Sequence, residues 1–168
     1  MSDLNRFDAD LDRRILILDG AYGSLLQSLN LKEADFRGER FADHTHPVQG
    51  NHDLLCLAAP EVVRDAHAQY LAAGADIIKT NSFTATQVAQ ADYGLESAVA
   101  EINLEAARIA RTVADDYATE AQPRYVAGVL GPTNRTASLS PDVNDPGFRN
   151  VTFADLAKDY SEAAENLI

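Results

Sequence analysis

The chain has 168 residues, 46% of them hydrophobic, which is enough for one domain with its own core. Its 14 Lys and Arg against 26 Asp and Glu give a formal net charge of −12, which repels phosphate backbones and anionic lipid headgroups, so neither nucleic acid nor a membrane is an expected partner. The polar, acid-rich N-terminus and the absence of an apolar run near the roughly 18 residues that span a bilayer favour a soluble cytoplasmic protein.

Three apolar runs, each followed by turn residues and then by helical periodicity, predict strand–loop–helix units. After a polar lead-in at residues 1–12, the first run covers residues 15–18. The second run covers residues 75–78, and the third covers residues 125–130. Residues 13–168 are therefore expected to form one α/β domain.

Apolar residues between these runs recur at spacings of three and four, so each predicted helix has one face that packs on a sheet. The residues of these two faces are Val63, Ala66, Tyr70 and Ala73, then Val99, Ile102, Ala106, Ile109 and Val113. The loop after the third run is longer than the typical 2–6 residues of a βα connection, and Thr152 with Asp155 resembles the N-cap of a last helix. The alternation predicts a parallel sheet, for which a doubly wound fold and a barrel both fit.

Candidate binding residues follow the three predicted strands, because ligands of parallel α/β folds bind where the loops at the carboxyl ends converge. Asp19, beside Gly20 and Ala21, could hold a substrate ammonium group, or it could be a turn or N-cap residue. Asn81 could orient a carboxylate, or it could cap the next helix. Thr133 could bind an anionic group, or it could fix the long loop to the rim of the sheet.

A lysine, three histidines and the single cysteine are further candidates for catalysis or metal binding. Lys79, at the end of the second strand, would suit the Schiff-base chemistry of a lysine-dependent lyase on a partial barrel. His44, His46 and His52 lie close in sequence, but their spacing fits no metal motif and a solvated loop is the simpler interpretation. Cys56 is the only cysteine, which excludes an intrachain disulfide and a metal site with several cysteines from this sequence alone.

Four segments resemble the cobalamin-dependent methionine synthases of the homocysteine S-methyltransferase family. They are ILDGAYGS, GADIIKTNSF, AEINLEAARIAR and VAGVLGPTNRTASLSPDVNDPGFRN. The similarity runs from about residue 14 to residue 168, with the segments in the same order. It implies the first three βα units of a (β/α)₈ TIM barrel, that is, an incomplete parallel sheet flanked by helices.

The resemblance also implies roles for individual residues. Asp19 matches the aspartate after the first strand that contacts the amino group of homocysteine, and Gly20 and Ala21 match the loop beside it. Asn81 and Thr133 fall at the strand ends where the family lines its substrate pocket. The implied activity is the transfer of a methyl group from methylcobalamin or 5-methyltetrahydrofolate to homocysteine, which gives methionine.

The departures from the family pattern matter as much as the matches. In the family a zinc ion on three cysteines of later strands holds the homocysteine sulfur, and Cys56 matches none of them. Zinc and cobalamin are therefore expected in the parent enzyme and not on this chain, which should be inactive alone. The expected partners are homocysteine, the remaining barrel and the cobalamin and folate modules; a non-catalytic, self-associating fragment is an alternative. Lys79 stands where relatives carry an acidic residue, which alters the charge near the pocket.

Overall fold

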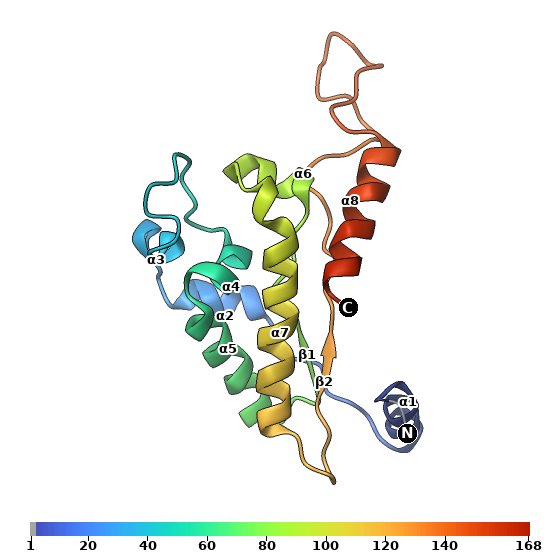
Figure 1. Cartoon of the computed structure of the whole chain (residues 1–168). Helices are drawn as coiled ribbons and strands as arrows, with labels where there is room; N and C mark the ends of the chain where they lie inside the picture. The colour runs from blue at the N-terminus through green and yellow to red at the C-terminus, as the bar shows by residue number, and fades with distance from the viewer. Residues whose placement is uncertain (1–2) are drawn as a thin grey trace.

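The computed structural model describes residues 3–168 and shows helices packed around a small parallel sheet (Figure 1). Residues 1 and 2 of the expected lead-in lie outside the described residues, and the rest forms helix α1 (Asp3–Arg13). This helix lies apart from the others in Figure 1 and reaches the sheet through Tyr125. The Phe7 and Tyr125 rings meet edge to face at 4.9 Å, and the Tyr125 hydroxyl donates to Asp10 Oδ2 at 2.8 Å. The division into a lead-in and a domain stays a prediction.

Two of the three expected strands form. Strands β1 (Ile77–Lys79) and β2 (Tyr125–Ala127) pair in parallel, with Ile78 opposite Val126. The first expected strand, at residues 15–18, is reduced to one parallel bridge between Leu18 and Ile77. Its side chains gain little burial, since Ile15 is 84% exposed and Leu18 is 49% exposed, so little apolar packing holds this segment as a regular strand. The structure is therefore a mixed α/β fold in which three regular βα units are not complete.

Asp76 joins the amino ends of all three extended segments. Its carboxylate accepts the Ile17 N–H at 2.9 Å, and its own N–H donates to the Ile17 carbonyl at 2.8 Å. The Tyr125 N–H donates to the Asp76 carbonyl at 2.8 Å, which links the start of β2. Arg14 lies 2.8 Å from the buried carboxylate and Arg124 lies 3.7 Å from it. We call this set of contacts the Asp76 clamp; it fixes the register of the three segments.

Helices α5 (Pro60–Ala72) and α7 (Val99–Tyr117) pack against each other and against the sheet, and α8 (Phe153–Asn166) lies along another side of α7 (Figure 1). The predicted apolar face of α7 is confirmed, because its five residues are all buried. The predicted cap of α8 is also confirmed: the Thr152 hydroxyl accepts the Asp155 N–H at 3.1 Å, and Asp155 accepts the Thr152 N–H at 2.9 Å. These helices place the loops that follow the strands.

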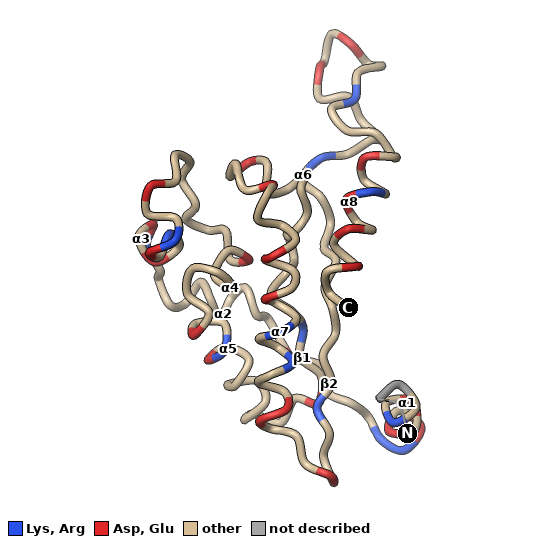
Figure 2. The backbone as a smooth tube through the Cα atoms, viewed as in Figure 1, with Lys and Arg blue, Asp and Glu red and all other residues tan. Residues whose placement is uncertain are grey.

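Shorter helical segments connect these elements. They are α2 (Tyr22–Ser28), α3 (Glu33–Arg37), η1 (His52–Leu54), α4 (Leu55–Ala58), α6 (Gln87–Gln90), η2 (Ala91–Tyr93) and η3 (Glu96–Ala98). Figure 2 shows acidic residues spread along α7, α8 and the loops, with basic residues interspersed among them. Among residues 3–168, no helix is both long enough and apolar enough to cross a membrane.

The Asp76→Asn variant tests the clamp. Burial works to raise the pKa of Asp76, but the Ile17 N–H and the Arg14 guanidinium outweigh it and lower the pKa, so the carboxylate is charged at neutral pH. Asparagine keeps the shape and leaves the buried Arg124 without its counter-charge, which should lower the free energy of unfolding by about 3 kcal/mol. Urea unfolding followed by circular dichroism measures this loss.

Asp115→Asn is the matched control, because Asp115 forms an exposed ion pair with Arg111 within α7. We expect no measurable change in the unfolding midpoint for this variant. Equal stability of the two variants would contradict the clamp.

Candidate active site

A cavity of about 450 Å³ opens at the carboxyl ends of the extended segments. Its walls come from the start of α2, the loop before α4, the end of β1 with the loop that follows, and the segment after β2. The lining residues are Tyr22, Gly23, Leu26, Gly50, His52, Asp53, Lys79, Thr80, Asn81, Phe83, Thr84, Tyr93 and Val129. This is the position at which ligands bind in parallel α/β folds.

Asp19 does not itself line this cavity; it is buried and paired with Lys79, which does line it. The Lys79 ammonium donates to Asp19 Oδ1 and to the Asp19 carbonyl, the latter at 3.1 Å, and the Lys79 N–H donates to Asp19 Oδ2 at 3.0 Å. Gly20 and Ala21 follow as exposed backbone. An added Cβ on Gly20 would lie 3.2 Å from Tyr70 Cε1, so the loop passes close to α5. The predicted carboxylate therefore lies at a strand end, with its charge already balanced by Lys79.

Asn81 lines the cavity and does not cap a helix. Thr86 is the N-cap of α6, and its hydroxyl accepts the Ala89 N–H at 3.4 Å. The prediction that Asn81 could cap the next helix is therefore wrong. The Asn81 Nδ2 donates to the His52 carbonyl at 2.8 Å. Its Oδ1 accepts no hydrogen bond from any residue that the structure describes, which leaves an acceptor for a ligand.

Cys56 packs under Asn81, with the thiol 3.5 Å from the Asn81 carbonyl. Burial raises the pKa of Cys56 to about 12, so the group is a neutral thiol at physiological pH. The Cys56 side chain is buried in the core, with 3% of its surface exposed.

Asp53 and Thr84 both line the cavity and are hydrogen-bonded to each other. The Thr84 N–H and the Thr84 hydroxyl both donate to Asp53 Oδ2 at 2.6 Å. Burial raises the pKa of Asp53, and the two hydrogen bonds oppose that rise. The expectation of a solvated loop around the histidines is wrong at this end: Asp53 is buried and His52 is partly buried, because the chain turns into η1 and α4.

His67, on α5, lies behind Tyr22 with its ring centroid 5.0 Å from the Tyr22 ring. The His67 side chain is fully buried, and neither ring nitrogen has a hydrogen-bond partner among the described residues. Burial lowers the pKa of His67 to about 4, and the nearby Asp19 charge opposes that change. The ring is therefore neutral at physiological pH and supports the cavity wall.

Thr133 lies outside this cavity. Its hydroxyl donates to the Arg135 carbonyl at 2.6 Å, and Asn134 and Arg135 each contact the Asp92 carboxylate at 2.5 Å. These contacts support the interpretation that this segment fixes the long loop to its surroundings. Gly131 allows the chain after β2 to pass close to Phe83, because a Cβ at this position would overlap the Phe83 carbonyl oxygen.

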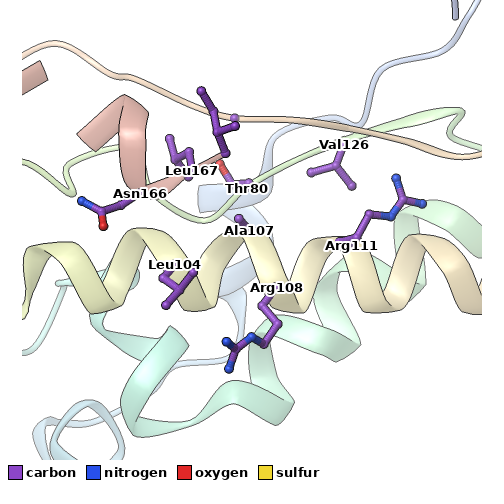
Figure 3. Close-up of a pocket in the computed structure, with 10 residues that line it drawn as sticks. Thr80, Leu104, Ala107, Arg108, Arg111, Val126, Asn166 and Leu167 are labelled. Atoms are coloured by element: carbon purple, nitrogen blue, oxygen red, sulfur yellow. The ribbon is translucent and has the colours of Figure 1, made fainter. Parts of the chain in front are cut away.

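A second cavity, of about 380 Å³, lies between α7 and the end of α8 (Figure 3). Figure 3 shows Leu104, Leu167 and Val126 around it, together with two arginines from α7. Both arginines already have carboxylate partners within α7, Arg108 with Glu105 and Arg111 with Asp115. We therefore place the candidate site at the strand ends and not here.

Comparison with known proteins shows the family of this chain. Residues 16–168 match the family model described as homocysteine S-methyltransferase. The chain belongs to the homocysteine S-methyltransferase family. Crystal structures of the homocysteine methyltransferase MmuM from Escherichia coli, in metallated and oxidized forms, each align with a TM-score of 0.66 and 24% identity. The two alignments cover 95% and 94% of this chain but only 52% and 50% of MmuM, so the chain spans about half the length of that relative.

The described residues of this family member do not form a zinc site. They contain no group of three or more His, Cys, Asp or Glu side chains placed to hold a metal ion. Cys56 is also a poor ligand, because coordination requires a thiolate and its raised pKa keeps it protonated. No catalytic step is therefore assigned to a metal on these residues.

The pH dependence of stability tests the position of His67 in this family member. Its pKa is about 4 in the folded chain and about 6.5 when unfolded, so the unfolded state takes up the proton first as the pH falls. The contribution of the neutral, buried His67 ring to the free energy of unfolding is complete above pH 6.5. It is lost between pH 6.5 and 4, where the free energy of unfolding falls by roughly 3 kcal/mol. We expect His67→Leu to remove this part of the pH dependence of urea unfolding.

The exposed His46 supplies the control, since His46→Gln should keep the wild-type pH profile. A His67→Leu profile parallel to wild type between pH 6.5 and 4 would show that the ring titrates normally.

Proposed function

We propose that this chain is the homocysteine-binding part of a methionine synthase, an enzyme that transfers a methyl group from methylcobalamin or 5-methyltetrahydrofolate to homocysteine. The observation that carries the proposal is the buried Asp19 carboxylate at the strand ends, in a chain of the homocysteine S-methyltransferase family. In this proposal the carboxylate binds the substrate ammonium together with the Gly20 carbonyl. The cobalamin and folate modules, like the remaining barrel, are partners of the proposed parent enzyme.

The cavity offers suitable surroundings for the rest of the substrate. The free Oδ1 of Asn81 and the Thr84 hydroxyl oxygen, whose proton is donated to Asp53, can each accept a hydrogen bond from an N–H or S–H donor of the substrate. Leu26, Phe83 and Val129 supply apolar walls for the thiol-bearing side chain. Thr133 is proposed to act only through the loop that it braces, since it does not line the cavity.

Methyl transfer requires more than this binding site. A free thiol has a pKa near 8.5 and is mostly protonated at neutral pH, so its sulfur needs activation before it attacks a methyl group. Zinc coordination is the chemistry that the family implies for this activation. Because the described residues form no zinc site, we propose that the isolated chain binds homocysteine but produces no methionine.

The alternative of a lysine-dependent lyase has less support. A Schiff base needs a free amine, and the Lys79 side chain is held by Asp19 and by two backbone carbonyls.

One observation favours the alternative of a non-catalytic, self-associating fragment. Within the described chain β2 pairs only with β1, and the exposed Leu130 follows it, so this edge could pair with a second copy.

Isothermal titration with L-homocysteine and with 4-mercaptobutanoate, its analogue without the amino group, tests the role of Asp19. Asp19→Asn should weaken homocysteine binding by about tenfold or more, because a charge-assisted contact is lost from a buried position. Binding of 4-mercaptobutanoate should be no weaker than in wild type.

Asp43→Asn is the matched control, since Asp43 is exposed and does not line the cavity. It should leave both affinities unchanged. Equal homocysteine affinity in the Asp19→Asn variant, with a wild-type unfolding curve, would refute the proposed binding mode.

A further inference from the structure

The ammonium group of Lys79 occupies the same place at Asp19 that a substrate ammonium would need. It donates to Asp19 Oδ1, to the Asp19 carbonyl at 3.1 Å and to the Gly20 carbonyl at 3.4 Å. These three acceptors match the three N–H donors of an ammonium group. The other carboxylate oxygen is occupied as well, because it accepts the Lys79 N–H at 3.0 Å.

The exposure of the two side chains shows which one has to move. The Asp19 side chain is 0% exposed and the Lys79 side chain is 30% exposed. Lys79 therefore shields the carboxylate and can itself be reached from the cavity that it lines. A cationic ligand gains access to Asp19 only when the flexible lysine side chain swings away into the cavity.

We propose that Lys79 is an internal competitor for the ammonium site at Asp19 and thereby determines the ligand specificity of the cavity. The inference rests on the proposed function, since it takes an amino acid thiol as the displacing ligand. Such a ligand must break the Lys79–Asp19 ion pair before it binds. A thiol carboxylate without an amino group leaves the pair intact and places its own negative charge near the Lys79 ammonium. Lys79 thus shifts the preference from amino acids toward thiol carboxylates.

Titration of L-homocysteine and 4-mercaptobutanoate into Lys79→Met tests this competition. We expect homocysteine to bind about fivefold tighter than to wild type, which is about 1 kcal/mol of binding free energy for a partly exposed ion pair. Binding of 4-mercaptobutanoate should be no tighter than in wild type. A purely structural role of Lys79 would move both affinities in the same direction, so the ratio of the two is the decisive readout.

Two variants serve as controls. Lys79→Arg keeps the competing cation and should keep the wild-type ratio, and Lys158→Met removes an exposed lysine of α8 without touching the cavity. Unfolding curves establish that each variant folds, and Lys79→Gln replaces Lys79→Met if the latter does not.

The outcomes separate the two proposals. Homocysteine binding that is unchanged or weaker in Lys79→Met overturns the competition and leaves the proposed function standing. Homocysteine binding by none of the variants, wild type included, overturns the proposed function and the competition with it.

Discussion

The register that the Asp76 clamp imposes on the three extended segments is the constraint on which the candidate site depends. One buried carboxylate holds Ile17 and the two arginines at the amino ends. With that end fixed, Asp19 and Lys79, sixty positions apart in sequence, come into contact at the other end. A slip by one residue would turn every side chain of the segment to the opposite face and would separate this pair.

The same geometry places the Asp19–Lys79 ion pair at the edge of the cavity, where Lys79 lines it and Asp19 is fully buried. A buried carboxylate is costly unless a counter-charge and hydrogen bonds satisfy it, and Lys79 supplies both. In the proposed binding mode a substrate ammonium replaces the Lys79 ammonium at Asp19. Part of the binding free energy is then used to break the Lys79–Asp19 ion pair.

The long helices follow the sequence pattern closely, and a cavity lies at the strand ends where candidate residues were predicted, but the reduction of the first strand to one bridge and several buried contacts were not predicted. Strong periodicity in α7 and the cap at Thr152 are local signals, so they were reliable. The first strand was overpredicted, because the burial of Ile15 depends on neighbours that local sequence does not show. The burial of Asp53 could not be predicted for a similar reason: its partner Thr84 lies 31 positions away, so no local pattern indicates that the carboxylate is buried.

The most direct test of the account is to titrate L-homocysteine into the ¹⁵N-labelled chain and follow the backbone amide resonances. Binding at the Asp19 carboxylate predicts shifts that cluster at residues 19–23 and 79–84, with the residues of the α7–α8 cavity unaffected. Shifts confined to residues 104–111 and 166–168, or no shifts at saturating ligand, would contradict it.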